Sequence, residues 1–576
     1  MKKYFGILVI LLLCLFGCST TNNTKQQLES VELQYSEFIL QWETVENAEY
    51  YEIFVNNVSF VKIYETQYDL SSLRNGSYTI GVIAFDEDNE YKKSELVLIE
   101  VVIEKEEPTP DIPPVHQHSF VNGECSCGAK DPNYVKPPVN DDGMGEREIE
   151  FFMINDTHGA FSDGDYAGMT RISSYFNVND PEDQFIKVAN GDIFQGSYVS
   201  NIFYGLPLVD ALNTLDFDCF VVGNHEFDWG IEEIAKYKDG NMSNGEAEFP
   251  FLGANIIDKR TNQIPEWMDP YTIIEKNGLK IGIIGVMGET HESSILQTYI
   301  ENYEFTNVLP VVKNYSKLLR TSEGCDLVVV SIHDYDETLN ANMAKLSGDE
   351  RIDLILCGHT HTNNFQEFTR NDGKKIIAVQ NQDKNRSASH VSIQVLDKQY
   401  VSSKFTRIYP SNYSIDSNFD KLLNTYDQYI NMGERVLGKT NSNISKSTLG
   451  YYSTSAMTDY FDVDYSIINT AGVRATIGKG DITVSDVFNC FPFNNEVIIV
   501  ELKGSELISL YNKNGDYLYL DKGFNISSIN YNSVYEIAVI DYVFTGVYYT
   551  EFKNKEYVDT NVLLRDILIE YIDNLY

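Results

Sequence analysis

Short runs of hydrophobic residues recur between residues 147 and 399, and several of them end at polar side chains. Such runs are typical of buried strands in a parallel sheet. They end as follows: 149–154 before Asn155-Asp156-Thr157-His158, 185–189 before Asn190-Gly191-Asp192, 219–222 before Gly223-Asn224-His225, 327–332 before His333, and 354–357 before Gly358-His359-Thr360-His361. Because ligands of open α/β sheets bind at the carboxyl ends of strands, we expect these polar groups to share one site.

The amino-terminal residues have the pattern of an export signal. Lys2 and Lys3 precede an apolar run at 5–16, which is shorter than the ~18 residues that span a bilayer. Cys18 follows Gly17 in a pattern that resembles a bacterial lipobox. We expect a lipoprotein signal peptide at 1–17, a lipidated Cys18 and a tether at 18–28, which anchor the protein to the cell membrane outside the cytoplasm. The alternative is an ordinary cleaved signal with an incidental cysteine.

Hydrophobic and polar residues alternate over residues 29–105. Phe38, Leu40 and Trp42 follow this period of two, and so do the segments 51–55 and 78–84. The pattern predicts half-buried strands, and it resembles an immunoglobulin-like β-sandwich of the fibronectin type III kind. We favour a spacer domain here over an adhesive or sugar-binding module.

Residues 106–146 are rich in proline and acidic residues, which predicts an extended linker. Within it, two imidazoles and two thiols lie within a dozen residues: His116, His118, Cys125 and Cys127. Histidine and cysteine are the usual zinc ligands, so a second, small metal site is one possibility. Free thiols or a local disulfide are the alternatives, because Cys-x-Cys is tighter than the usual zinc spacing.

Charge narrows the range of functions. The 576 residues carry a formal net charge of -41, which argues against binding a nucleic-acid polymer, because that binding depends on clustered Lys and Arg. The length predicts several domains. Neither observation indicates an oligomeric state.

The motifs together resemble the metallophosphoesterase superfamily, and specifically the secreted 5'-nucleotidase family. The matching segments are Asp156-x-His158, Gly191-Asp192, the Gly-Asn-His-Glu-Phe-Asp stretch at 223–228, His333, and Gly-His-Thr-His at 358–361. The resemblance implies a multidomain chain. A four-layer α/β sandwich would occupy 147–399, a linker with one helix, centred on 419–436, would occupy 400–436, and an α+β substrate domain would occupy 437–576.

The resemblance also implies two divalent metal ions, which activate water and offset charge on a phosphate ester. Zinc or manganese suits the mixed nitrogen and oxygen donors best, and iron also fits. One ion would be held by Asp156, His158, Asp192 and His361, and the other by Asp192, Asn224, His333 and His359. His225 matches the family's catalytic histidine, and Asp228 would orient its imidazole. His291 and His390 match no motif, and we interpret them as structural.

The last 140 residues match the family less completely. The matching substrate-binding positions are Asn469, Arg474, Phe493, Asn495 and Tyr542, with Phe493 and Tyr542 as the two aromatic walls of a base clamp. Tyr548 stands where the family has an Asp that holds the ribose. An expected Arg is missing near Lys446, which is a partial substitute. The metal centre therefore matches better than nucleoside recognition does.

These patterns predict a lipid-anchored, metal-dependent phosphoric ester hydrolase that acts on nucleotides, including cyclic nucleotides or nucleotide sugars. One alternative keeps the same two-metal hydrolysis but uses a phosphate ester that is not a nucleotide. A second is a non-catalytic surface-binding protein built on the same scaffold. Phosphate release would separate the enzyme from the scaffold protein.

Overall fold

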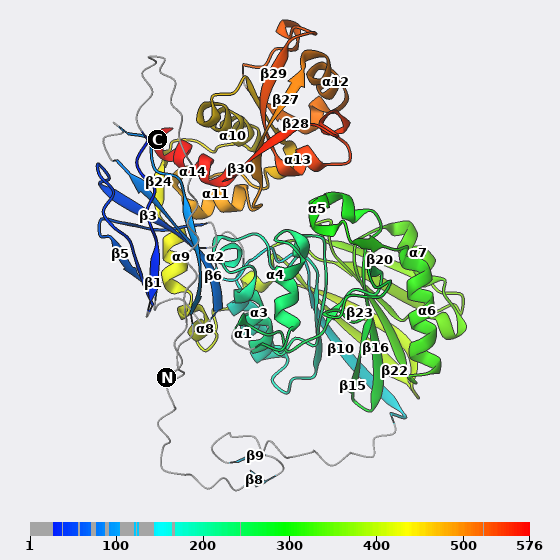
Figure 1. Cartoon of the computed structure of the whole chain (residues 1–576). Coiled ribbons are helices and arrows are strands. Elements are labelled where there is room, and N and C mark those ends of the chain that lie inside the picture. The colour runs from blue at the N-terminus through cyan, green and yellow to red at the C-terminus, as the bar shows by residue number, and fades with distance from the viewer. Residues whose placement is uncertain are drawn as a thin grey trace. The chain divides into compact units, whose positions relative to one another are not determined.

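The chain forms two compact units, Met1–Ile103 and Glu104–Tyr576, in a computed structural model (Figure 1). The residues that the structure describes are 27–36, 38–55, 58–70, 76–86, 91–103, 120–121, 124–125, 143–163, 167–241, 244–521 and 523–575. The expected signal peptide and Cys18 lie outside these residues. No helix among them is long and apolar enough to cross a membrane.

The first unit contains two antiparallel sheets. The strand orders are β1 (Gln34–Ser36), β2 (Ile39–Gln41), β5 (Gln67–Asp69), and β4 (Val58–Ile63), β3 (Tyr50–Val55), β6 (Gly76–Phe85), β7 (Val97–Ile103). Leu40, Ile53 and Ile80 are fully buried, and Trp42 packs edge-on against Tyr51. The unit therefore has buried residues from both sheets and fits the expected β-sandwich.

Two six-stranded sheets form the first lobe of the second unit (residues 146–408). The first sheet has the order β13 (Phe251–Leu252), β12 (Cys219–Val221), β11 (Phe185–Asn190), β10 (Glu146–Ile154), β22 (Ala388–Leu396), β23 (Gln399–Ile408). The second has the order β15 (Tyr271–Lys276), β16 (Leu279–Met287), β18 (Leu327–His333), β19 (Leu354–Cys357), β21 (Lys375–Gln380), β20 (Asn364–Thr369). The central strands of each sheet run parallel.

The two sheets pack face to face, with helices on their outer faces. One hydrophobic core contains Phe151 and Val188 of the first sheet together with Ile283 and Val329 of the second. Helix α1 (Met169–Asn179) places Tyr175 and Phe176 against Phe152, on the outer face of the first sheet. Helices α6 (Val308–Thr321) and α7 (Glu337–Ala344) cover the second. This is the four-layer arrangement expected from the motifs.

The chain between the lobes differs from expectation in two ways. Strand β23 (Gln399–Ile408) pairs with β22, so the first sheet continues past residue 399. The single helix expected near 419–436 is two short helices, α8 (Asp420–Asn424) and α9 (Asp427–Gly433). Tyr426 lies between them, fully buried, and its hydroxyl donates to Asp210 at 2.7 Å. This buried side chain fixes the position of the chain between α8 and α9.

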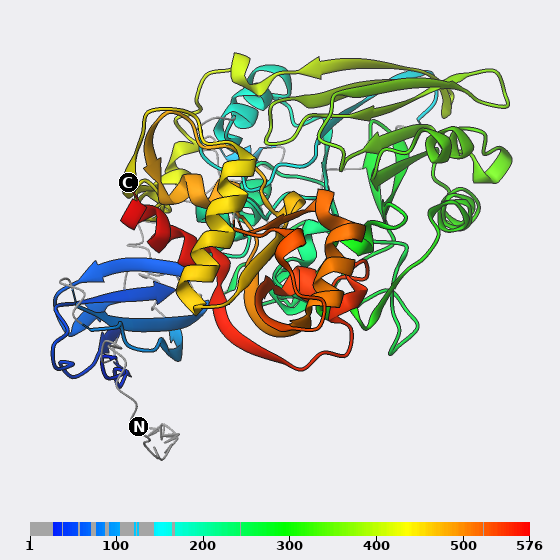
Figure 2. The same ribbon diagram turned by 90° about the horizontal axis from the view of Figure 1, so that it is seen from above.

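The second lobe (residues 436–575) is α+β, as predicted. Its five-stranded sheet has the order β28 (Leu518–Leu520), β25 (Tyr465–Asn469), β29 (Val534–Ile540), β27 (Glu496–Lys503), β30 (Tyr557–Leu563). A smaller sheet pairs β24 (Val436–Thr440) with β26 (Gly480–Thr483). The helices are α10 (Lys446–Phe461), α11 (Val484–Cys490), α12 (Gly504–Asn514), α13 (Asp541–Thr545) and α14 (Leu564–Leu575). Helix α10 packs on β25 and β28 and lies beside α14 (Figure 2).

Candidate metal centre and substrate pocket

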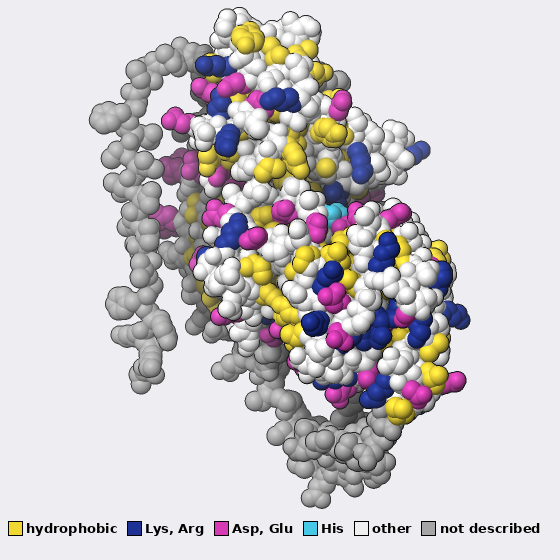
Figure 3. Space-filling model, turned by 90° about the vertical axis from the view of Figure 1, so that its right-hand side faces the viewer, with side chains coloured by type: hydrophobic (Ala, Val, Ile, Leu, Met, Phe, Trp, Pro, Cys, Tyr) yellow, Lys and Arg dark blue, Asp and Glu magenta, His cyan; other side chains and the backbone are white. Residues whose placement is uncertain are grey.

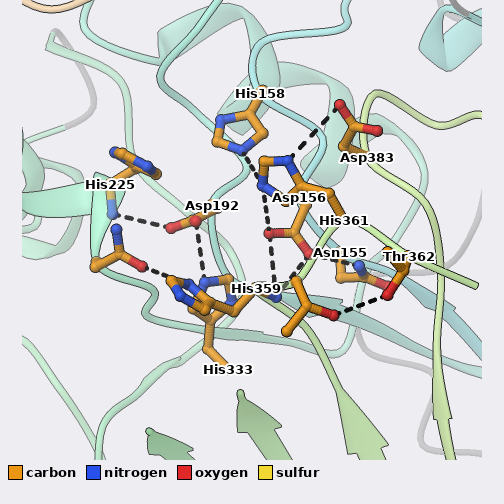
Figure 4. A network of polar contacts seen from close by, with 12 residues as sticks. Asn155, Asp156, His158, Asp192, His225, His333, His359, His361, Thr362 and Asp383 are labelled. Atoms are coloured by element: carbon orange, nitrogen blue, oxygen red, sulfur yellow. Dashed lines mark hydrogen bonds and ion pairs between the residues drawn. The ribbon is translucent and has the colours of Figure 1, made fainter. Parts of the chain in front are cut away.

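The candidate metal ligands lie where neighbouring strands of the two sheets end. Asp156 and His158 follow β10, Asp192 follows β11, and Asn224 follows β12. In the second sheet His333 ends β18, and His359 and His361 follow β19. The buried apolar strands therefore bring together side chains that are two hundred positions apart in the sequence (Figure 4).

Two groups of side chains could each hold a cation. Asp156, His158, Asp192 and His361 form the first group, and their ligand atoms all lie within 4.8 Å of one another. His158 Nε2 is 3.1 Å from His361 Nε2, which is 3.4 Å from Asp156 Oδ1. Four donors of this kind are enough to hold one cation.

The second group contains Asp192, His333 and His359. His333 Nε2 lies 3.0 Å from Asp192 Oδ2, and His359 Nδ1 lies 3.0 Å from the amide oxygen of Asn224. Asp192 belongs to both groups. The geometry is therefore that of two adjacent cation sites joined by one carboxylate.

Five of these residues have left-handed backbone conformations, with φ of 51° at Asp156, 46° at His158, 54° at Asp192, 80° at His359 and 58° at His361. Non-glycine residues rarely adopt positive φ, and such strain concentrates at functional sites. The fold imposes this strain so that consecutive turns aim their side chains at one point.

Gly191 permits the close approach of two of these turns. Its φ is 73°, and a Cβ there would lie 2.2 Å from His333 Nδ1. Any side chain at this position would therefore displace a candidate ligand.

The donor set fits metal ions. Asp192 Oδ2 and His333 Nε2 are buried without a hydrogen-bond partner and face the shared position. Burial lowers the pKa of His158, and burial together with His333 and His291 lowers the pKa of His359 to about 3. Both imidazoles are therefore neutral, which is the state that binds a metal.

Backbone carbonyls orient two of the imidazoles. His158 Nδ1 donates to Gln195 O at 3.1 Å, and His333 Nδ1 donates to Asn190 O at 2.9 Å. In each ring this leaves Nε2 facing the cluster. Such outer contacts are a regular feature of metal sites.

His225 and Asp228 form a buried pair beside Asp192. His225 Nδ1 is 2.7 Å from Asp228 Oδ2, and the His225 backbone N–H donates to Asp192 Oδ1 at 2.9 Å. Burial alone would lower the pKa of His225, but Asp228 and Asp192 outweigh burial and raise it. Burial also raises the pKa of Asp228 against the opposing effect of His225. We favour the charged pair, because the short contact directly stabilises the imidazolium.

The five substrate positions expected in the second lobe all line one cavity of about 550 Å³, together with Asp192, Asn224, His225, His359 and His361 of the first lobe. The ring centroids of Phe493 and His225 are 5.6 Å apart, and the Arg474 guanidinium is 5.8 Å from the Phe493 centroid. A histidine is visible in the hollow between the lobes in Figure 3. The structure thus joins the metal ligands and the expected base clamp in one pocket.

Lys446 and Tyr548, the two departures from the family pattern, lie in different places relative to the cavity. Lys446 lines the cavity, whereas Tyr548 is 64% exposed and is not among the cavity-lining residues that the structure describes. Lys446 is thus placed to supply positive charge. Tyr548 does not replace the missing ribose-binding carboxylate.

The sequence motifs did not assign roles to several residues at the site. Glu226, within the 223–228 stretch, accepts backbone N–H groups of the Asp192 turn. His291, interpreted above as structural, lies against His359. Tyr299 lines the cavity from the first lobe. Of these three residues, only Glu226 could have been found from the sequence, because it lies inside a matched motif. His291 and Tyr299 are brought to the site by the tertiary fold.

The possible second metal site falls mostly on residues outside the described ranges. Cys125 ends the two-residue strand β9 (Glu124–Cys125), while His116, His118 and Cys127 lie outside the described residues. The other cysteines in the part of the chain that the structure describes, Cys219, Cys325, Cys357 and Cys490, are buried free thiols.

Comparison with known proteins identifies both lobes. Residues 149–363 match the family model of the calcineurin-like phosphoesterases, and residues 425–532 match that of the 5'-nucleotidase C-terminal domain. Fold and candidate centre together define a metal-dependent phosphoesterase, a hydrolase. The chain therefore carries a calcineurin-like phosphoesterase domain and a 5'-nucleotidase C-terminal domain.

Relatives are distant in sequence. A 5'-nucleotidase of Vibrio cholerae is 24% identical over 426 residues, which is 63% of this chain and 75% of that protein. The cell wall protein Lmo0130 of Listeria monocytogenes is 25% identical over 443 residues, 63% of this chain and 56% of that protein. The aligned part spans 30% to 75% of the length of such curated relatives.

The fold also occurs in solved structures. A 5'-nucleotidase precursor from Thermus thermophilus superposes with a TM-score of 0.62 at 19% identity, covering 74% of this chain and 97% of that one. The two chains therefore share the two-lobed fold.

Proposed function

We propose that this chain hydrolyses nucleotides, releasing phosphate from nucleoside 5'-monophosphates or related esters. The observation that carries the proposal is the single cavity in which the candidate metal ligands face Phe493, Asn495 and Tyr542. A molecule with a phosphate at one end and a flat ring at the other fits this cavity, because the candidate metal ligands face the phosphate and the aromatic side chains face the ring. The match to a 5'-nucleotidase C-terminal domain supports the same substrate class.

The residues at the phosphate end would hold two divalent cations, one in each group around Asp192. Bound there, the cations supply Lewis acidity that makes water more acidic and offsets charge on the phosphoryl oxygens. Imidazole, carboxylate and amide donors suit zinc or manganese best, and iron also fits.

His225 is the group that we assign to proton transfer. Its imidazole lines the cavity, and Asp228 holds Nδ1, so Nε2 is free to donate a proton to the leaving oxygen. The raised pKa, caused by Asp228 and Asp192, favours retention of that proton on the ring. Arg474 and Lys446 add positive charge at the same cavity and would bind the phosphate.

The nucleoside end is less complete than the phosphate end. Phe493 and Tyr542 supply two aromatic faces, and stacking is worth about 1–3 kcal/mol per base. The family's ribose-binding Asp has no counterpart at its own position, where Tyr548 stands and is largely exposed. This departure favours a second candidate, the same hydrolysis of a phosphate ester that is not a nucleotide.

We also propose where the enzyme works. Cys18 would carry a lipid anchor on the outer side of the membrane, and the β-sandwich of the first unit, of fibronectin type III kind, would act as a spacer. The likeness to a cell wall protein of Listeria supports a location outside the cytoplasm. A cell fractionation of wild type and Cys18→Ala would locate the protein.

The substrate class can be tested with Phe493→Ala. We expect kcat/KM for AMP to fall about 10- to 100-fold, because one stacking face is lost, while kcat/KM for ribose 5-phosphate changes little. The measurement is phosphate release by the metal-loaded enzyme from both substrates.

Phe365→Ala is the matched control, since Phe365 is 51% exposed on β20 and lines no part of the cavity. The nucleotide proposal fails if AMP is among the poorest substrates, or if Phe493→Ala lowers both activities equally. In that case the second candidate replaces it.

A further inference from the structure

His291 matches no motif but touches the metal centre. Its imidazole stacks on that of His359, with ring centroids 3.7 Å apart and planes 26° from parallel. It belongs to the short 3-10 turn η4 (His291–Ser294), which follows β16. His291 does not line the substrate cavity. Among the candidate ligands, His359 is the one that His291 contacts in the part of the chain that the structure describes.

Asp334 holds the outer side of this imidazole. Its Oδ1 is 3.1 Å from His291 Nε2 and also accepts the Tyr335 N–H at 2.6 Å. Asp334 directly follows β18, the parallel neighbour of β16. Gly288 makes room for the carboxylate, because a Cβ there would lie 2.5 Å from Asp334. Two adjacent strand ends thus supply both members of the pair.

The backbone before His291 is strained. Thr290 has φ of 75°, which is an outlier for a β-branched residue. Such strain persists only where surrounding contacts enforce it, and it is common at functional sites. Here those contacts are the stack on His359 and the pairing with Asp334.

The His359 ring is oriented by different contacts from the rings of His158 and His333. His158 and His333 each donate Nδ1 to a backbone carbonyl. Among the described residues, no backbone carbonyl accepts a hydrogen bond from the His359 ring, whose Nδ1 instead lies 3.0 Å from the amide oxygen of Asn224. The flat face of His291 is a further contact that restricts the plane of this ring.

We propose that His291, held by Asp334, is a positioning residue for the cation site formed by Asp192, Asn224, His333 and His359. It prevents the His359 ring from turning away and so preserves the affinity of that one site. The site around His158 and His361 does not depend on it.

The experiment is a titration of chelator-stripped protein with Zn²⁺, followed by calorimetry and by competition with a chromophoric chelator. In His291→Ala we expect the affinity for one of the two ions to fall about 10-fold or more, as loss of an outer contact does at other sites, while the other ion binds as in wild type. His291→Phe keeps a flat ring on His359 and should retain most of the affinity.

His390→Ala is the matched control. His390 also pairs with a carboxylate, Glu150 Oε2 at 2.6 Å, and also matches no motif, but it contacts none of the candidate ligands. Circular dichroism checks that each variant is folded. If His291→Ala is not folded, Asp334→Asn provides a second, milder disturbance of the same contact.

The proposal is overturned if His291→Ala binds both ions like wild type or like His390→Ala, or if His291→Phe loses as much as His291→Ala. Steady-state kinetics give a further readout: with Zn²⁺ saturating, KM for AMP should not change in His291→Ala. Wild-type protein that binds no ion would overturn the metal centre itself, which is a different result.

Discussion

Glu226 shows how one buried side chain holds several turns of the centre. Its Oε2 accepts the N–H groups of Asp192 and Gly223 at 2.9 and 2.8 Å, and its Oε1 accepts that of Ile193 at 2.9 Å. The carboxylate thereby fixes the turn that carries Asp192. The motif included Glu226 but did not indicate its role, because two of these three partners lie in a turn more than thirty residues away.

We expect Glu226→Gln to lower the free energy of unfolding by about 1–3 kcal/mol, because an amide nitrogen would face N–H groups and leave buried donors unpaired. Metal affinity should fall as well. Urea unfolding of the metal-free protein measures the first effect. Glu232→Gln, at an exposed position, is the control, and equal stability of the two variants would contradict the structural role of Glu226.

The ends of strands, rather than helices, position most of the candidate functional side chains. The same is true in the second lobe, where Asp541, the first residue of α13, directly follows β29. Asp541 lines the cavity, and its Oδ1 accepts hydrogen bonds from Asn495 Nδ2 at 2.9 Å and from the Tyr542 N–H at 2.6 Å. Burial raises the pKa of Asp541 to about 7.

This shift makes stability depend on pH. The folded state keeps a proton on Asp541 up to about pH 7, whereas the unfolded state releases it near pH 4. The folded state therefore binds more protons between these values, and the free energy of unfolding falls as pH rises through this window. From pH 5 to 7.5 we expect Asp541 to contribute a loss of about 2–3 kcal/mol.

Asp541→Asn keeps an acceptor for Asn495 but cannot ionise, so its decline in stability over this range should be smaller by that amount. Urea unfolding at both pH values is the measurement. Asp516→Asn, on the surface of the same lobe, should decline like wild type. Parallel curves for all three proteins would contradict the assignment.

The lobes form one cavity because they are joined by contacts that no local pattern predicts. Asn201 Nδ2 donates to Pro492 O at 2.7 Å, and Tyr198 packs edge-on against Phe488. The buried Arg565 donates to Phe493 O and lies over the Phe488 ring at 3.8 Å. These contacts set the aromatic wall at a fixed place beside His225.

Because the candidate ligands come from both sheets, metal binding should stabilise the whole first lobe. Added Zn²⁺ at about 100 times its Kd would stabilise the folded chelator-stripped protein by about 2.7 kcal/mol per site. A thermal melt should show a higher melting temperature with Zn²⁺ in wild type and in Asp349→Asn, an exposed control. In Asp192→Asn most of this increase should be lost, since both candidate sites use that carboxylate. An undiminished increase in melting temperature would rule out the shared site.

The order of apolar runs and polar strand ends predicted the central strands and the polar groups at their ends, because burial of a strand and the chemistry of a metal donor are both local properties. The layered α/β lobe and the assignment of candidate ligands to two ions followed from the resemblance to the metallophosphoesterase superfamily. Helix boundaries near 419–436, the roles of Glu226 and His291, and the place of Phe493 next to His225 were not predictable in this way. They depend on contacts between distant segments, whose free energy is set only when the sheets pack and the second lobe meets the first.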